Sequence, residues 1–321
     1  MTAGGFLVEI SVVIPMHNEE LGLDALFSRL LPCLARVTED YEVVCVNDGS
    51  RDDTYAALQA HSAREPRIKL VNLSRNFGKE IALSAGLDYT SGAAVIPLDA
   101  DLQDPPELIP ALVEQWHKGY KVVLATRKSR PGDSWAKRKS AEYFYKAMNY
   151  VSTVKIPPNT GDFRLMDRVV VEAVKRMPER TRFMKGIFAW VGFSTTTIYF
   201  DRESRVAGTT TWNYWKLWKF ALDGIFSFTS VPLRVWTYIG ALISLFSLFW
   251  ALFMLIKTLI FGNPVAGYPS LIIAVCFMGG MQLLSIGIIG EYVGRIYRES
   301  KHRPLYLVAH TQGFGEHYDE R

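Results

Sequence analysis

In Ala94-Val-Ile-Pro-Leu-Asp-Ala-Asp-Leu-Gln-Asp104, an apolar run passes directly into an acidic segment. The pattern predicts a buried strand that ends where the backbone turns outward, and it places Asp99 and Asp101 at that end. Hard cations such as Mg²⁺ and Mn²⁺ prefer oxygen ligands and commonly bridge a protein carboxylate to substrate phosphates. The pair therefore indicates a metal site that serves a nucleotide-diphosphate donor. Taken alone, an Asp-x-Asp motif is more often a pair of solvated loop residues than a metal site. The metal-site interpretation therefore depends on the rest of the chain.

Further short, β-branched runs surround this strand, and stretches of helical length and periodicity separate them. Alternating strands and helices predict a parallel α/β sheet that binds ligands beyond the carboxyl ends of its strands. Polar clusters follow four of the strands, which puts the clusters around one crevice. The strands are expected at 10–14, 41–46, 68–72, 93–98 and 121–124, and the clusters at 15–20, 47–50, 75–79 and 99–104.

Two long uncharged runs lie in the C-terminal third of the chain. Residues 235–256 and 269–290 each provide 22 residues without a charge. Each is long enough for about 33 Å of helix, which spans a bilayer core. The runs predict a transmembrane hairpin, with buried core helices as the alternative. Basic residues flank the outer ends of both runs, whereas the connecting loop holds only Lys257, so both ends are expected to face the cytoplasm.

The predicted hairpin divides the chain into four segments. Residues 1–211 are expected to form a cytoplasmic α/β domain, 212–232 an interfacial amphipathic helix, 233–291 the membrane hairpin and 292–321 a cytoplasmic tail. The interfacial helix is predicted because Trp215, Trp218, Leu222 and Ile225 share one helical face beside a membrane span. A soluble helix packed on the α/β domain is the alternative. The first residues show no secretory signal pattern.

Composition and charge narrow the classes of partner. With 49% hydrophobic and 21% charged residues, the chain leans toward membrane association. The net charge of +4 is small and concentrated beside the apolar runs, so lipid headgroups explain it better than nucleic acid does. Cys33, Cys45 and Cys276 have neither a zinc spacing nor a disulfide framework. Glycines at 279, 280, 287 and 290 are able to pack helices of neighbouring protomers, so a homo-oligomer is expected.

Five motifs in order along the chain resemble those of family 2 glycosyltransferases, which have a GT-A fold. They are Val12-Val-Ile-Pro-Met-His-Asn-Glu-Glu20, Val46-Asn-Asp-Gly-Ser50, Asn76-Phe-Gly-Lys79, Leu98-Asp-Ala-Asp-Leu-Gln-Asp-Pro105 and Thr160-Gly-Asp-Phe-Arg-Leu-Met166. Within the family, the chain is similar to polyprenyl-phosphate glycosyltransferases, the group of dolichyl-phosphate mannose synthase. It most resembles the bacterial and phage bactoprenol glucosyltransferases of O-antigen and lipopolysaccharide modification.

The resemblance implies a metal-dependent, inverting enzyme that moves glucose from UDP-glucose to undecaprenyl phosphate. It implies a multi-pass protein of the bacterial inner membrane, with the catalytic domain and both termini in the cytoplasm, and a homo-oligomer such as a tetramer. Mannose, galactose, an N-acetylhexosamine or an aminoarabinose derivative stay open as alternative sugars, because they differ by single groups. A catalytically silent membrane adaptor that binds sugar nucleotide also stays open. A processive polysaccharide synthase would need more spans and a Gln-x-x-Arg-Trp-type motif, and the sequence shows neither.

The resemblance also implies roles for individual residues, with Mg²⁺ or Mn²⁺ as the cofactor. Asp162 matches the catalytic base, and a helix cap before residues 163–175 is its structural alternative. A lipid phosphate is mostly ionised near neutral pH, so Asp162 is expected mainly to orient the acceptor or balance charge. Donor binding is expected of Pro15, Asn18, Glu20, Asp48, Lys79, Asp99 and Arg127, metal binding of Asp99, Asp101 and Gln103, and acceptor-phosphate binding of Arg164, Arg182, Lys185 and Arg205.

Overall fold

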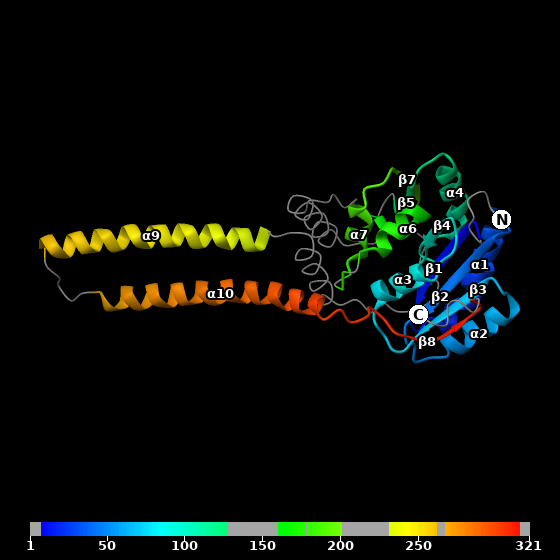
Figure 1. Cartoon of the computed structure of the whole chain (residues 1–321), viewed down its shortest axis with the longest axis horizontal. Coiled ribbons are helices and arrows are strands. Elements are labelled where there is room, and N and C mark those ends of the chain that lie inside the picture. Colours follow the sequence, from blue (N-terminus) through cyan, green and yellow to red (C-terminus); the bar gives the residue numbers. More distant parts are fainter. Residues whose placement is uncertain are drawn as a thin grey trace.

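The computed structural model describes residues 8–127, 160–177, 179–180, 182–200, 231–261 and 267–314. In these ranges the chain forms an α/β domain from which a helical hairpin projects (Figure 1). The hairpin consists of α9 (Val231–Phe261) and α10 (Tyr268–Ser300). After α10, the chain returns to the domain, where the short strand β8 (Val308–Gln312) ends the described part.

The described strands form one sheet in the order β7-β5-β6-β4-β1-β2-β3-β8. The central pairs β4–β1, β1–β2 and β2–β3 are parallel, so the polar segments after β1, β2 and β4 meet at one edge. β6 runs antiparallel between β4 and β5, and β8 runs antiparallel beside β3. The remaining strands are β1 (Ile10–Met16), β2 (Tyr41–Asn47), β3 (Ile68–Leu73), β4 (Ala94–Pro97), β5 (Val122–Arg127), β6 (Thr160–Asp167) and β7 (Thr195–Phe200).

The α/β sheet is confirmed, but the prediction of an entirely parallel sheet is wrong. All five predicted strands are present, whereas β6, β7 and β8 were not predicted. β6 places the polar Asp162 and Arg164 on one face and the apolar Phe163 and Leu165 on the other. Because half of its side chains are polar, this strand reads in the sequence as a functional motif and not as part of a sheet.

Helices cover both faces of the sheet. Alternate residues of β1 show this, because Val12 and Ile14 pack toward α1, α2 and α4, whereas Val13 packs toward α3, α6 and α7. The helices are α1 (Leu23–Ala35), α2 (Thr54–Arg64), α3 (Lys79–Asp88), α4 (Ile109–His117), α6 (Arg168–Lys175) and α7 (Met184–Trp190), with 3₁₀ turns η1 (Glu20–Gly22) and η2 (Pro106–Leu108).

Gly86 lets α3 approach the sheet closely. A Cβ at this position would lie 2.2 Å from Val13 Cγ1 and 3.0 Å from Val46 Cγ2. Since α3 begins at Lys79, this contact also determines how Lys79 is presented at the sheet edge.

We expect Gly86→Ala to destabilise the domain by about 1–3 kcal/mol, because the added methyl group overfills a close-packed contact. Thermal unfolding in detergent, followed by circular dichroism, measures the change. Gly240→Ala in α9 is the matched control, because a Cβ there has no atom within 4 Å. Equal melting temperatures for the two variants would contradict the packing argument.

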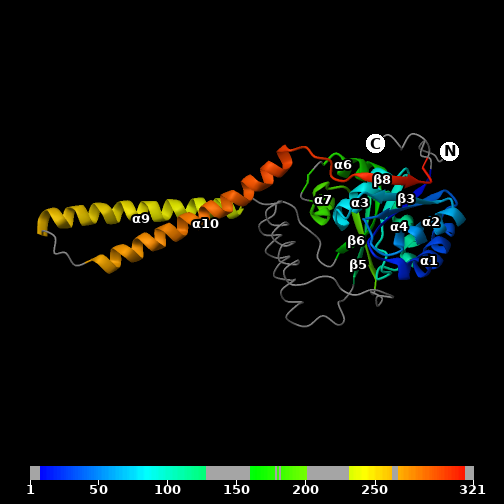
Figure 2. The same cartoon turned by 90° about the horizontal axis from the view of Figure 1, so that it is seen from below.

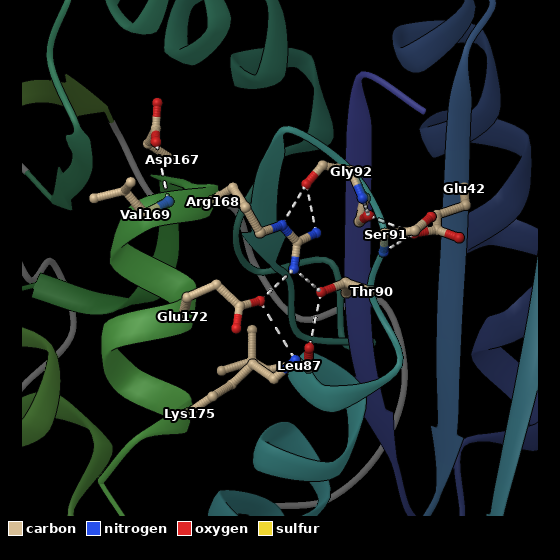
Figure 3. A network of polar contacts seen from close by, with 11 residues as sticks. Glu42, Leu87, Thr90, Ser91, Gly92, Asp167, Arg168, Val169, Glu172 and Lys175 are labelled. Carbon is tan, nitrogen blue, oxygen red and sulfur yellow. Dashed lines mark hydrogen bonds and ion pairs between the residues drawn. The ribbon is translucent and has the colours of Figure 1, made fainter. Parts of the chain in front are cut away.

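Polar contacts hold the amino end of β4 (Figure 3). Arg168, the first residue of α6, donates from Nε to the Gly92 carbonyl oxygen at 2.7 Å and from Nη1 to Thr90 Oγ1 at 3.2 Å. Ser91 donates from its backbone N and its Oγ to Glu42 Oε1, at 2.6 and 2.9 Å. The loop before β4 is therefore attached to α6 on one side and to β2 on the other. This attachment fixes the strand that carries the acidic segment at its opposite end.

The helices α9 and α10 lie next to each other in both views of the molecule (Figures 1 and 2). Both expose large apolar side chains, among them Leu242, Leu259 and Leu283 at 72%, 77% and 72% exposure. Within the part of the chain that the structure describes, no helix meets the length and apolarity expected of a membrane span. The hairpin is present, and its transmembrane character stays a prediction. The expected interfacial helix lies outside the described residues, apart from its last two positions.

The C-terminal segment differs from the predicted tail. α10 continues to Ser300, and β8 then pairs with β3 at the edge of the sheet. Tyr306 Oη donates to Asp88 Oδ2 at 2.8 Å, and the Phe314 ring lies 5.2 Å from that of Tyr89. The segment is thus part of the α/β domain. Its strand is short and polar, which explains why the sequence pattern does not reveal it.

Candidate active site

Lys79 joins two of the predicted acidic residues at the carboxyl edge of the sheet. Its Nζ lies 2.7 Å from Asp99 Oδ1 and 3.0 Å from Asp162 Oδ2. Lys79 is the first residue of α3, Asp99 lies in the segment after β4, and Asp162 lies near the start of the strand β6. Loss of water opposes the charge of the ammonium, but Asp99 and Asp162 outweigh this effect and raise the pKa of Lys79. The structure therefore places the predicted donor side and the predicted catalytic residue on either side of one cation.

Asp162 is a buried carboxylate, 9% exposed. Burial by itself would raise its pKa, but the charges of Lys79, Lys185 and Arg164 outweigh burial and lower the pKa of Asp162 to about 2. Its Oδ1 is buried and has no hydrogen-bond partner among the residues that the structure describes. The alternative reading of Asp162 as a helix cap is wrong, because Asp162 lies within β6.

The residue that caps the following helix is Asp167. Its Oδ1 accepts a hydrogen bond from the backbone N of Val169 at 3.1 Å, at the start of α6. The predicted helix over residues 163–175 therefore begins five residues later, at Arg168. The polar–apolar alternation of β6 hid this boundary in the sequence.

Glu80 is a second, half-buried carboxyl group at this site, and it was not predicted as a site residue. Its Oε2 is buried and has no hydrogen-bond partner among the described residues. Burial and then the charge of Asp162 raise the pKa of Glu80 to about 7, although Lys79, Lys185 and a backbone hydrogen bond from Met184 oppose the rise. Its position next to Lys79 in the Asn-Phe-Gly-Lys motif is the only signal that the sequence offers.

The raised pKa of Glu80 predicts a pH-dependent effect on stability. Between the unfolded-state pKa near 4.5 and the folded-state pKa of about 7, the folded protein keeps a proton that the unfolded chain releases. Glu80 therefore lowers stability progressively as the pH rises through this window. We expect Glu80→Gln to change the melting temperature little at pH 5 and to raise it at pH 8, by the equivalent of about 3 kcal/mol. Glu39→Gln, at an exposed position, is the control, and a pH-independent difference for Glu80→Gln would contradict the assignment.

The Asp-x-Asp segment turns sharply after β4. Leu102 has a φ of 55° with its side chain buried, and Gln103 N donates to Asp101 Oδ1 at 3.2 Å. Among the described residues, no group of three or more His, Cys, Asp and Glu side chains is arranged to hold a metal ion. Metal binding by Asp99, Asp101 and Gln103 therefore stays a prediction, and a hard cation bound here would need phosphate oxygens or water to complete its ligands.

The pKa of Asp104 reflects the negative charge of the neighbouring acidic segment. Burial raises the pKa of Asp104, Arg127 opposes the rise, and the carboxylates of Asp99 and Asp101 raise it further. Oxygen donors in a region with excess negative charge are the chemistry that suits Mg²⁺ or Mn²⁺. The residues present therefore fit the predicted metal.

Arg127, the last residue of β5, lies beside the acidic segment. Its Nη2 donates to Asp104 Oδ1 at 3.1 Å, and its Nε is buried and has no hydrogen-bond partner in the part of the chain that the structure describes. A Cβ on Gly161 would lie 3.6 Å from Arg127 Nη2, so the guanidinium group also adjoins the start of β6. Asp104 was not predicted as a site residue, although it is the last residue of the acidic segment after β4.

Asp48 organises the loop that leads into α3. Its two carboxylate oxygens accept hydrogen bonds from Phe77 N at 2.6 Å and Gly78 N at 2.9 Å. The next residue, Gly49, has a φ of 60°, and a Cβ there would lie 2.5 Å from the backbone of Arg75. The two loops are therefore packed directly against each other, and Asp48 helps to position Lys79.

The other predicted donor residues lie nearby, at the ends of β1 and β2. Asn18 Oδ1 accepts from Arg51 N at 2.8 Å, and Glu20 Oε2 accepts from Asp53 N at 3.4 Å. Pro15 pairs with Val46 near the end of β1. The predicted donor residues thus lie together at the ends of these two strands, and the crevice and donor contact by these residues stay predictions.

The structure brings two of the four predicted acceptor-binding residues to Asp162. Arg164 donates from Nη2 to the Gly161 carbonyl oxygen at 2.7 Å and from Nε to that of Asp162 at 3.3 Å. Its guanidinium carbon lies 4.4 Å from the centre of the Phe188 ring. Burial lowers the pKa of Arg164 to about 10, although Asp162 and Glu80 oppose this. Lys185, on α7, is close enough to lower the pKa values of both carboxyl groups.

Arg182, a third predicted acceptor residue, does not join this group. Arg182 interacts with Asp88, Glu179 and Glu299, and Asp88 ends the helix that Lys79 begins. The structure therefore places Arg182 at the far end of α3 from Asp162, because residues 182–185 run along that helix. Arg205 lies outside the described residues.

Comparison with known proteins matches this geometry to a family. Residues 11–175, about half of the chain, match the family called Glycosyl transferase family 2, and residues 231–296 match the GtrB C-terminal hairpin. The chain belongs to glycosyltransferase family 2. It is 60% identical to an uncharacterised glycosyltransferase of Synechocystis sp., over 95% of this chain and 96% of that one. It is 50% identical to the bactoprenol glucosyl transferase of Shigella phage SfV, over 94% of this chain and 98% of that one, and 47% identical to a prophage bactoprenol glucosyl transferase homologue of Escherichia coli, over 94% and 98%.

The family assignment confirms the resemblance predicted from the five motifs. This family 2 glycosyltransferase has the GT-A type of α/β sheet, followed by the hairpin that its second family match describes. All five motifs fall within the described residues and meet at the carboxyl edge of the sheet or in β6. The roles of the single residues within that arrangement stay predictions.

Proposed function

We propose that this family 2 glycosyltransferase transfers glucose from UDP-glucose to undecaprenyl phosphate. The observation that carries the proposal is the position of Lys79 between Asp99 and Asp162, because it joins the acidic segment after β4 to the cations around the buried Asp162. A nucleotide diphosphate fits the first side, and a phosphate acceptor fits the second. The full-length likeness to proteins named bactoprenol glucosyl transferase supports glucose as the sugar and a polyprenyl phosphate as the acceptor.

The donor would lie in the crevice beyond β1, β2 and β4. Pro15, Asn18, Glu20 and Asp48 surround its uridine end, and Arg127 and Lys79 reach its phosphates. Asp99, Asp101 and Gln103 would hold Mg²⁺ or Mn²⁺, which, when bound, neutralises charge on the leaving diphosphate. Arg127 stabilises the same developing charge from β5, because a guanidinium group binds phosphate oxygens in a bidentate manner.

The reaction we propose is a single displacement. An oxygen of the acceptor phosphate forms a bond to the anomeric carbon, the bond from that carbon to the diphosphate oxygen breaks, and the configuration inverts. Because the second pKa of a phosphate monoester is near 6, the acceptor arrives mostly as a dianion and needs little deprotonation. With a pKa of about 2, Asp162 is a weak base, so we assign to it the positioning of Lys79, Lys185 and Arg164 around the acceptor.

We further propose that α9 and α10 anchor the enzyme in the bacterial inner membrane. Large exposed apolar side chains on both helices, the two uncharged 22-residue runs and the match to the GtrB C-terminal hairpin support this. The anchor would keep the active site at the cytoplasmic surface, where the lipid phosphate is concentrated. The basic residues at the outer ends of the runs favour an orientation with both termini in the cytoplasm. Glycines along α10 with open space around them support association into a homo-oligomer, such as a tetramer.

The decisive experiment presents detergent-purified protein with undecaprenyl phosphate and a panel of labelled nucleotide sugars. We expect a glucosyl lipid from UDP-glucose in the presence of Mg²⁺ or Mn²⁺. Product from a mannose, galactose, N-acetylhexosamine or aminoarabinose donor instead would correct the sugar and keep the reaction. Thermal stabilisation by UDP-glucose and Mn²⁺ without turnover of any donor would contradict an enzyme and favour a sugar-nucleotide-binding adaptor.

A further inference from the structure

A cavity of about 170 Å³ lies between α7 and the sheet, beside the cations that surround Asp162. Arg164 and Lys185 line it together with apolar side chains that include Val122, Leu124, Phe188 and Phe193. We call this cavity the α7 trough. A wall that joins two cations to a mainly apolar surface is complementary to a ligand with an anionic head and a hydrocarbon body.

The trough extends from the active site along the face of the sheet. Thr160, opposite Thr126 near the carboxyl end of β5, lines one end, two residues from Asp162. Thr195, which lines the other end, pairs with Val122 at the amino end of β5. Arg164 lies between them, opposite Leu124. A molecule whose head group reaches Asp162 can therefore extend its body beneath α7.

The hairpin lies on the same side of the domain as α7. Both views show α7 at the part of the domain that is nearest to α9 and α10 (Figures 1 and 2). A ligand that arrives from an apolar surface around the hairpin would thus meet the trough before it meets the donor crevice, which lies beyond β1, β2 and β4.

We propose that the α7 trough binds the phosphate-proximal hydrocarbon of the acceptor, a branched polyprenyl phosphate, with Arg164 and Lys185 contacting its phosphate. This inference rests on the proposed function, and it adds the part of the acceptor that the enzyme recognises. The volume corresponds to roughly five or six water molecules, so the trough holds the first units of the chain and leaves the rest outside. A small water-soluble phosphate would leave the apolar walls uncovered, and a nucleotide would place polar groups against them.

Filling the trough tests the proposal. Thr195→Trp adds a large side chain at an exposed position that lines it, and Ala189→Leu adds a smaller one on α7. Thr197→Trp is the matched control, because Thr197 is also exposed on β7 but does not line the trough. We expect both filling variants to raise the KM for undecaprenyl phosphate, Thr195→Trp by at least about 10-fold. The KM for UDP-glucose should stay unchanged in both, and the control should stay within twofold of the wild type. Unchanged acceptor KM values in both filling variants would overturn the proposal.

A second measurement does not depend on turnover. Farnesyl phosphate carrying a photoreactive group on its hydrocarbon is irradiated with the full-length protein, and the labelled peptides are identified. We expect labels within residues 184–195, and their loss in Thr195→Trp but not in Thr197→Trp. Labelling confined to other segments would overturn the trough, whatever the activity. Labels at the trough in a protein that transfers no sugar would support the trough as a lipid-phosphate site and would contradict the proposed reaction.

Discussion

Asp162→Asn is expected to lower kcat for lipid glucosylation about 100-fold or more. The negative charge of the carboxylate attracts Lys79, Lys185 and Arg164 and holds them in one arrangement. A neutral amide of the same shape does not attract these cations, so their arrangement around the acceptor is lost. The acceptor KM should not rise, because removing a negative charge makes the site more favourable for a phosphate. Steady-state kinetics with labelled UDP-glucose, at several concentrations of undecaprenyl phosphate, measures both parameters.

The pH dependence separates positioning from base catalysis at Asp162. A group whose pKa is about 2 is ionised at every pH at which the enzyme is assayed, so the residual activity of Asp162→Asn should follow the same pH profile as the wild type. Glu114→Gln, on the exposed surface of α4, is the control for the amide substitution. Near-normal turnover by Asp162→Asn would show that the site assignment is wrong. A profile that loses an acidic limb in the variant would restore the base role.

A fold check accompanies this variant. The pKa of Asp162 is lower in the folded protein than its ordinary value of 3.8, so its charge stabilises the fold above that pH and the contribution is lost as the pH falls toward 2. Some loss of stability at neutral pH is therefore expected for Asp162→Asn. Retention in membranes and stabilisation by UDP and Mn²⁺ would show that the variant still folds and binds the donor.

From the sequence, the residue types of this site can be predicted more completely than the contacts between them. Asp99, Asp101 and Lys79 are predictable because each follows a buried strand or opens a helix, and parallel strands bring such positions to one edge. The link between Lys79 and Asp162 is not predictable, because β6 reaches the sheet after a long intervening segment and reads as a polar motif. Distances between segments that are remote in sequence depend on strand order, which hydrophobic periodicity alone does not encode.

Other misses have similar causes. Glu80 looks like a solvated residue at a helix start, and only the folded structure shows that one of its carboxyl oxygens is buried. Arg182 belongs to a basic segment that suits a phosphate, yet the direction in which residues 182–185 run along α3 carries it away from Asp162. The strand β8 is too short and polar to be recognised before its pairing with β3 is known. In each case tertiary packing decides what local sequence leaves open.

Asp101→Asn is expected to abolish detectable transfer, a loss of about 1,000-fold or more, and to leave the protein in membranes. Asp101 lies on the turn after β4 and accepts a hydrogen bond from Gln103 N. In the proposed site its carboxylate would supply a charged oxygen ligand to the cation, and the uncharged amide of Asn would bind a hard cation more weakly. Loss of the cation would leave the charge on the departing diphosphate to Arg127 and Lys79 alone. Transfer to undecaprenyl phosphate and the Mn²⁺-dependent thermal stabilisation by UDP are the two measurements.

Chelation gives the same prediction without a mutation. Exhaustive treatment with EDTA should remove the activity of the wild type, and added Mg²⁺ or Mn²⁺ should restore it. Asp40→Asn serves as the control, because Asp40 is exposed and lies just before β2, at the opposite end of that strand from the acidic segment. If Asp101→Asn lost activity while the wild type kept full activity in EDTA, Asp101 would act through the loop that it shapes with Gln103 and not through a metal. The EDTA experiment therefore tests whether a bound cation is required, whereas Asp101→Asn alone tests only whether the carboxylate is required.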